Sequence, residues 1–251
     1  MHERYIKFEL PQKEQKIWRY MDFTKFMSLL DKKELYFSRA DKFSDKFEGT
    51  FPKANREMRD LTFEKDFGLL RGTSLTQSLN AMYKKYREYV FINCWHMNEY
   101  ESAAMWDLYV GGSEGIAIQS SFDRLEKAIE DCPQKIRFGK VEYRDFNKAP
   151  VSIDNAIDMF IYKRKSFEHE CELRAMHILP FVKNVAGWAD LEAESPVEHG
   201  LGISCNIEIL IEKIYISPTA PPWFEELVRS MCGKFNLVDC VFKSELSELP
   251  Y

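Results

Sequence analysis

The sequence has no long apolar segment and no excess of positive charge. No run of 18 or more apolar residues occurs among its 251 residues, so it offers no transmembrane helix. Its 35 Lys and Arg are outnumbered by 40 Asp and Glu, and the net charge of -5 argues against an overall electrostatic grip on nucleic acid. The N-terminus is charged where a secretory signal needs apolar residues. We therefore expect a soluble, cytoplasmic protein without a membrane partner.

Several motifs that carry chemistry in other proteins are also absent. The six cysteines include no C-x-x-C pair, and the five histidines show no H-x-x-x-H spacing, so we expect no metal site. The sequence contains neither a G-x-x-x-x-G-K-[ST] phosphate loop nor a G-x-G-x-x-G motif. The glycine cluster at 111–115 follows a predicted helix and precedes a predicted strand, which is the wrong order for a phosphate cradle. No G-x-S-x-G motif supports a serine nucleophile.

The sequence does contain enough apolar residues for one large core. Hydrophobic residues make up 45% of the chain, and short apolar strands alternate with amphipathic helices. The regular spacing of a doubly wound parallel sheet is missing. We predict a single α+β domain over residues 1–251, with mixed, mainly antiparallel sheets that form a cleft and with flanking helices. A helical insertion is predicted at 53–89, as helices at 54–67 and 75–89 separated by a break at 70–74.

Four sequence segments, taken in order, are distinctive. They are Ile17-Trp18-Arg19-Tyr20, Leu35-Tyr36-Phe37-Ser38 continuing to Phe43-Ser44-Asp45-Lys46-Phe47-Glu48-Gly49, Phe91-Ile92-Asn93-Cys94-Trp95-His96 with Ala104-Met105-Trp106-Asp107-Leu108-Tyr109, and Lys165-Ser166-Phe167-Glu168-His169-Glu170-Cys171-Glu172-Leu173-Arg174. In this order the segments resemble the bacterial family called domain of unknown function 2971, over roughly residues 17 to 245. The family pattern has Asn-Asp-Pro-Phe-Glu in the loop where this chain has Ser44-Asp45-Lys46-Phe47-Glu48. The family name assigns no reaction.

A second resemblance is to ADP-ribosyltransferases. In that class an Arg or His on the first strand holds NAD, and a late Glu steadies the oxocarbenium-like transition state. Here Arg19 lies on a predicted first strand at 16–21, and a predicted late strand at 170–179 carries Glu170 and Glu172. The resemblance implies NAD as the substrate and carboxylate catalysis. It favours Glu172, because the second Glu of an E-x-E pair has this role in the resembling families.

The predicted site has catalytic and nucleotide-binding parts. The catalytic candidates are Glu172, Glu170 and His96, and the NAD-binding candidates are Arg19, Tyr20, Ser38, Trp106 and Tyr109. Two carboxylates on one strand face repel each other and raise one pKa, which suits acid–base chemistry. Imidazole titrates near neutral pH, and a guanidinium fork suits a pyrophosphate.

Each candidate also has a structural interpretation. Arg19 could form a structural ion pair, and His96 could be a buried, satisfied residue. The glutamates could occupy a solvated strand face, paired with Arg174 or Lys165. The two aromatics of the helix predicted at 101–109 could belong to the core.

Three functions remain open at this point. The leading one is an NAD-using, ADP-ribosyltransferase-like enzyme with an unknown protein or nucleic-acid acceptor. The alternative is a non-catalytic ligand-sensing or partner-binding module of the kind used in phage defence or stress response. A metal-dependent hydrolase or nuclease comes third. Asp45 and Glu48 could bind a metal ion, but no third carboxylate at a suitable spacing lies near them in the sequence.

Overall fold

The computed structural model describes residues 8–148, 150–151, 157–187 and 189–248. The described strands are β1 (Lys16–Asp22), β2 (Glu34–Arg39), β3 (Val90–Met97), β4 (Gly115–Ser121), β5 (Ile136–Lys140), β6 (Glu142–Arg144), β7 (Tyr162–Arg164), β8 (Glu172–Ile178), β9 (Gly200–Ser204), β10 (Lys213–Ile216) and β11 (Val241–Lys243). The α-helices are α1 (Phe23–Lys32), α2 (Lys53–Phe67), α3 (Leu69–Tyr86), α4 (Ala103–Tyr109), α5 (Phe122–Ala128), α6 (Ile207–Leu210) and α7 (Pro222–Gly233). Short 3-10 helices are η1 (Ala40–Lys42), η2 (Asp158–Phe160), η3 (Lys165–Glu170), η4 (Val238–Cys240) and η5 (Glu245–Ser247).

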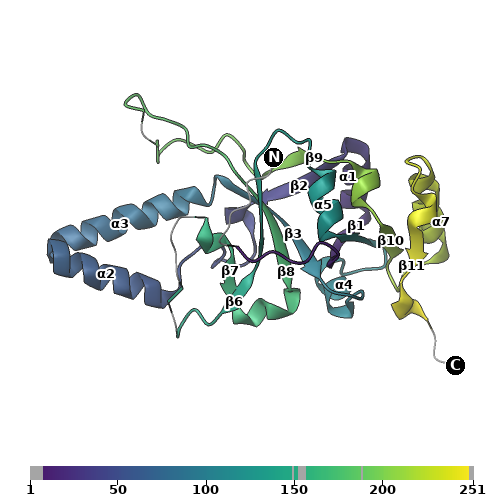
Figure 1. The fold of residues 1–251 in the computed structure, drawn as a ribbon, viewed down its shortest axis with the longest axis horizontal. Helices are drawn as coiled ribbons and strands as arrows, with labels where there is room; N and C mark the ends of the chain where they lie inside the picture. Colours follow the sequence, from purple (N-terminus) through teal and green to yellow (C-terminus); the bar gives the residue numbers. More distant parts are fainter. Residues whose placement is uncertain (1–7, 149, 152–156, 188, 249–251) are drawn as a thin grey trace.

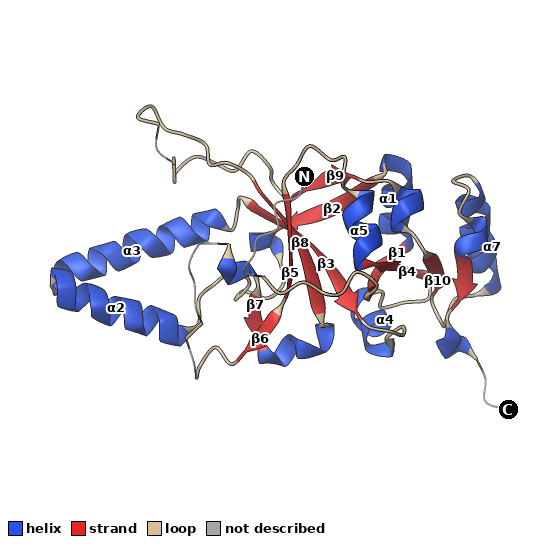
Figure 2. Cartoon of the chain, viewed as in Figure 1, coloured by secondary structure: helices blue, strands red, loops and turns tan. Residues whose placement is uncertain are grey.

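One large mixed sheet organises the fold (Figures 1 and 2). Among the described strands it contains nine, with the order β11-β10-β4-β1-β3-β2-β9 and with β8 and β5 added on the other edge of β3. All its pairs are antiparallel except β10 with β11. The short strands β6 and β7 form a separate parallel pair. The prediction of an α+β fold with a mainly antiparallel sheet is therefore confirmed.

Apolar side chains pack on both faces of this sheet. The largest cluster includes residues of α1, α5, α6 and α7 packed against alternate residues of the central strands. A smaller cluster on β1, β4 and β10 is covered by Met105 and Trp106 of α4. The start of α1 follows directly from sequence, because the Asp22 side chain accepts a hydrogen bond from the Lys25 amide at 2.8 Å. Within the described residues, no helix is long and apolar enough to cross a membrane.

The sheet forks at β3, and this fork positions the site. On one edge, β3 pairs with β8 throughout residues 90–96. On the other edge, β1 pairs with β3 only at 96–97, and β2 pairs with it only at 91–92. No described strand covers residues 93–95 on that edge, since β1 continues along β4 and β2 continues along β9. The diverging strands β1 and β2, connected by α1, therefore enclose an opening beside the middle of β3.

Residues 53–89, predicted as a helical insertion, contain the hairpin of α2 and α3, which extends away from the sheet (Figure 1). The predicted break at 70–74 is wrong. The chain turns at Gly68, whose φ of 78° favours glycine, and Gly72 lies inside α3. A Cβ at Gly72 would lie 2.9 Å from the Glu64 amide nitrogen, so Gly72 is needed where the two helices approach.

We expect the hairpin to open more readily than the sheet. α2 has no buried residue, whereas β3 is buried at most of its positions, so opening α2 exposes much less apolar surface. In native-state hydrogen exchange, amides of α2 should exchange faster than those of residues 90–95. Stronger protection in α2 than in β3 contradicts this prediction. Gly72→Ala should further accelerate exchange in both hairpin helices, while Gly233→Ala, in open space at the end of α7, should leave it unchanged.

Candidate functional site

A cleft with two connected parts occupies the fork. The inner chamber has a volume of about 150 Å³ and the outer chamber about 490 Å³. They share four lining residues, Arg19, Tyr20, Ser38 and Tyr109. A cavity of about 150 Å³ can hold one six-membered aromatic ring, and the outer chamber falls within the range of small-molecule sites. The predicted cleft is thus present between the diverging strands.

The inner chamber joins aromatic and carboxylate side chains. Its rings come from Trp18, Tyr20, Phe43, Trp95, His96 and Tyr109, and its carboxylates are Glu170 and Glu172. Seven of the eight predicted site residues therefore line one chamber. The eighth, Trp106, is buried behind it, with its ring centroid 5.1 Å from that of Tyr20 and its Nε1 donating to Glu101. Trp106 thus supports Tyr20 and does not line the chamber.

Arg19 is a cation without a carboxylate partner in the described structure. Its Nη1 donates to the Cys94 carbonyl at 3.3 Å and its Nη2 to the Tyr36 carbonyl at 3.5 Å, so the side chain bridges the fork from β1 to β3 and β2. The guanidinium also lies 5.9 Å from the centre of the Trp95 ring. These contacts leave its charge uncompensated at the junction of the chambers, where an anionic ligand can bind. The alternative of a structural ion pair is wrong for Arg19.

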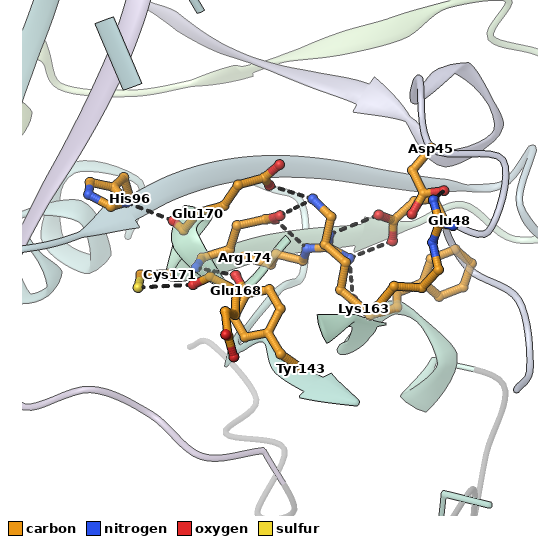
Figure 3. A network of polar contacts seen from close by, with 12 residues as sticks. Asp45, Glu48, His96, Tyr143, Lys163, Glu168, Glu170, Cys171 and Arg174 are labelled. Carbon is orange, nitrogen blue, oxygen red and sulfur yellow. Dashed lines mark hydrogen bonds and ion pairs between the residues drawn. The ribbon is translucent and has the colours of Figure 1, made fainter. Parts of the chain in front are cut away.

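The two glutamates meet through a buried lysine (Figure 3). Lys163 Nζ on β7 contacts both Glu170 Oε2 and Glu172 Oε1. Contrary to the predicted shared strand face, Glu170 ends η3, and Cys171 follows in a left-handed conformation with φ 41° before β8 begins at Glu172. The solvated-face alternative is also wrong, because Glu170 is 8% exposed and Glu172 4% exposed. The two carboxylates are therefore brought together by their shared contact with Lys163 and not by a common strand face.

A second buried cation fixes Glu172. Arg174 Nε donates to Glu172 Oε2 at 2.8 Å, as one structural alternative anticipated, whereas the other anticipated partner, Lys165, is replaced by Lys163. The same guanidinium binds both oxygens of Glu48 at 2.5 and 2.9 Å and donates to the Phe160 carbonyl at 2.7 Å. Both Glu172 oxygens are occupied by cations, while Glu170 uses only Oε2 in this network. Glu170 is therefore held by one cation of this network, whereas Glu172 is held by two.

The network separates the two carboxyl pKa values. Burial, followed by the adjacent Glu172, raises the pKa of Glu170 to about 7. Burial acts in the same direction on Glu172, but the charge of Arg174, a hydrogen bond from Glu170 and the charge of Lys163 hold its pKa well below the usual range. At neutral pH, Glu172 is ionised and Glu170 can take up or release a proton. This division suits general acid–base work by Glu170.

His96 is neutral near pH 7 in this environment. Burial lowers the pKa of its imidazole. Its Nδ1 lies 2.7 Å from the Glu170 carbonyl oxygen, which can only accept, so Nδ1 carries the proton. Its Nε2 is buried and has no hydrogen-bond partner in the described structure. His96 therefore orients the Glu170 backbone through one ring nitrogen, while its other ring nitrogen makes no hydrogen bond to the described residues. This fits neither the fully hydrogen-bonded buried histidine nor an established catalytic one.

Sequence reasoning did not single out Lys163, Glu48 or Arg174 as parts of the site. Lys163 belongs to a run of three basic residues at 163–165, a pattern typical of a solvated surface, but it lies on β7 and is 7% exposed. Arg174 follows Glu172 by two residues on a strand, and that spacing did predict their contact. Glu48 is 126 residues away from Arg174, and no local signal connects them. No group of three or more His, Cys, Asp or Glu that could hold a metal occurs within the described residues.

Comparison with known proteins finds a family match over part of the chain and no activity. Residues 105–175, less than a third of the chain, match the model of a family described as protein of unknown function (DUF2971). The match supports the resemblance to that family, and it includes most of α4, all of β4 and β5, and most of the carboxylate network. No curated protein and no solved structure matches the chain.

Proposed function

We propose that this protein, which matches the DUF2971 family model over residues 105–175, is an ADP-ribosyltransferase-like enzyme that uses NAD. One observation carries the proposal. An unpaired guanidinium, Arg19, and a carboxyl with a pKa near neutrality, Glu170, line the same small aromatic chamber. The first can hold a pyrophosphate, and the second can move a proton beside the ring-sized space.

The chamber residues would divide the work as follows. The aromatic walls receive the nicotinamide ring, and Arg19 at the junction donates to the diphosphate. The Ser38 hydroxyl, which has no hydrogen-bond partner in the described structure, is available to the ligand at the same junction. The nicotinamide ring then occupies the inner chamber, and the rest of the dinucleotide extends into the larger outer chamber.

In the proposed reaction, the bond between ribose C1′ and the nicotinamide nitrogen breaks, and its electron pair neutralises the pyridinium. A hydroxyl or amine of the acceptor forms the new bond to C1′. Glu170 accepts the proton that the acceptor loses, and Glu172 provides a fixed negative charge near the developing positive charge. The resemblance to ADP-ribosyltransferases favoured Glu172 as the principal catalytic residue. We assign proton transfer to Glu170, because both oxygens of Glu172 are bound by Lys163 and Arg174.

The test of this proposal is nicotinamide release from NAD by the purified protein, together with NAD affinity. We expect Arg19→Gln to weaken NAD binding at least tenfold, since charge-assisted hydrogen bonds contribute about 1.5–3 kcal/mol each. Arg19→Lys should recover part of the loss. Arg56→Gln, an exposed change on α2, should bind NAD like the wild type.

The outcomes separate enzyme from binding module. The transferase is supported if the wild-type protein releases nicotinamide and Arg19→Gln does so with a higher KM for NAD. Wild-type protein that binds NAD at Arg19 but releases no nicotinamide with protein or nucleic-acid acceptors supports the ligand-sensing alternative. Equal NAD affinity of the wild type and Arg19→Gln contradicts the proposed binding mode.

A further inference from the structure

A row of three side chains on β2 faces the outer chamber. Glu34, Tyr36 and Ser38 are alternate strand residues and all line this chamber. Leu35 and Phe37 alternate with them and are buried in the core, although Leu35 also borders the outer chamber. A carboxylate, an aromatic ring and a hydroxyl are thus placed in line along one wall, leading toward the inner chamber.

Two glycines of β9 make room for this row. Tyr36 is opposite Gly202 and Ser38 is opposite Gly200 in the antiparallel pairing of β2 with β9. A Cβ at Gly200 would lie 2.5 Å from the Tyr36 hydroxyl oxygen, and a Cβ at Gly202 would overlap the Glu34 carboxylate. Glu34 and Tyr36 therefore lie flat across β9, in space that any larger residue at 200 or 202 would fill.

The exposed groups of the row have unused binding capacity. Tyr36 covers Gly200, yet 49% of the residue is exposed, so its ring is available for stacking. In the described structure the Glu34 carboxylate has neither an ion pair nor a hydrogen bond, although it lines the same chamber as Arg19. A carboxylate only accepts hydrogen bonds, and a ribose diol offers two donors to it.

We propose that Glu34 and Tyr36 form a nucleoside subsite that accepts a base with an unmodified ribose and rejects a 2′-phosphorylated ribose. Tyr36 stacks on the base, and Glu34 accepts hydrogen bonds from the 2′ and 3′ hydroxyls. Arg19, at the inner end of the row, donates to the adjoining phosphate. The subsite itself contacts only the base, its ribose and the adjoining phosphate. It rests on the proposed function only in taking the whole ligand to be NAD.

Rejection follows from charge. A phosphate on the 2′ oxygen removes one hydrogen-bond donor and brings negative charge against the Glu34 carboxylate, an arrangement that disfavours the wrong ligand. Lys25 also lines the outer chamber, but its Nζ is paired with Asp22 Oδ2 at 2.6 Å. The row therefore predicts selection of NAD over NADP and of 5′-AMP over 2′,5′-ADP.

The experiment is calorimetric titration of the full chain with four probes, NAD, NADP, 5′-AMP and 2′,5′-ADP. Wild-type protein should bind each unphosphorylated probe at least tenfold more tightly than its 2′-phosphorylated counterpart. Glu34→Gln should reduce that ratio to about threefold or less, because the amide no longer repels phosphate. Tyr36→Leu should weaken all four probes about tenfold or more through lost stacking, whereas Tyr36→Phe should not. Glu226→Gln, exposed on α7, is the matched control.

The AMP pair keeps this inference independent of turnover. Selective binding of 5′-AMP that depends on Glu34 supports the subsite even if NAD is never cleaved, in which case only the proposed function fails. Nicotinamide release with an NAD to NADP ratio unchanged by Glu34→Gln overturns the subsite and leaves the proposed function standing. Absence of binding by all four probes to folded wild-type protein also overturns the subsite.

Discussion

Glu170→Gln should reduce the rate of nicotinamide release about 10²–10⁴-fold while NAD affinity changes less than about threefold. The amide is nearly isosteric with the carboxyl but cannot accept the proton of the attacking acceptor. Because NAD is held mainly by Arg19 in this proposal, binding should survive the change. Single-turnover release and equilibrium titration of the same variant measure the two effects separately.

The pH profile gives this prediction a second readout. A general base acts only when deprotonated, and the pKa of Glu170 is raised to about 7, so wild-type kcat/KM should increase with pH through about 7 and then level. Residual activity of Glu170→Gln should lack this rise. Glu168→Gln, at an exposed position on the same 3-10 helix, should keep both the rate and the profile of the wild type. An unchanged rising limb in Glu170→Gln would remove Glu170 from the mechanism.

Glu48→Gln should lower the free energy of unfolding by about 3–5 kcal/mol, the effect expected when one partner of a buried ion pair is neutralised. The side chains of Glu48 and Arg174 are both 0% exposed, and their two hydrogen bonds join the loop after η1 to β8. Glutamine keeps the size of Glu48 but leaves the Arg174 charge with only Glu172 to balance it. Urea denaturation followed by circular dichroism measures the loss.

A surface pair provides the comparison. Glu225 on α7 bonds Arg229 at 3.0 Å near solvent, and Glu225→Gln should cost no more than about 1 kcal/mol. If Glu48→Gln lowers the free energy of unfolding by no more than Glu225→Gln does, the attraction within the buried pair barely exceeds the cost of burying its two charges. Arg174→Met should be at least as damaging as Glu48→Gln, since it leaves Glu48 without a cation partner in the described structure and Glu172 with Lys163 alone.

Much of the cleft could be predicted because strand residues alternate. Strand alternation places Trp18 and Tyr20 on one face of β1, packed with α4, and Arg19 on the other face with Ile17 and Met21. All of Trp18, Arg19 and Tyr20 border the inner chamber. Asp22 as the helix cap and the apolar strand at 90–95 follow from equally local signals. Of the seven predicted site residues that meet in the inner chamber, six lie on a strand or within two residues of one, and Tyr109 ends α4.

The partners of the carboxylates could not be predicted in the same way. Lys163 lies on β7, outside the segments predicted to form the site, and the left-handed backbone at Cys171 separates Glu170 from the strand predicted at 170–179. Both depend on how segments pack after the chain has turned. A hydrophobic pattern carries no information about which buried cation a carboxylate meets.

The sequence by itself determined the α+β class, the strand faces and the residue types at the cleft, because side-chain alternation and helix capping act over a few residues. Only the tertiary structure decided that β1 and β2 separate along β3, that Glu48 meets Arg174, and that Glu34 lies over the β9 glycines. These contacts join segments far apart in the chain. Their stability comes from desolvation and charge pairing in a shared interior, which exists only once the sheet has formed.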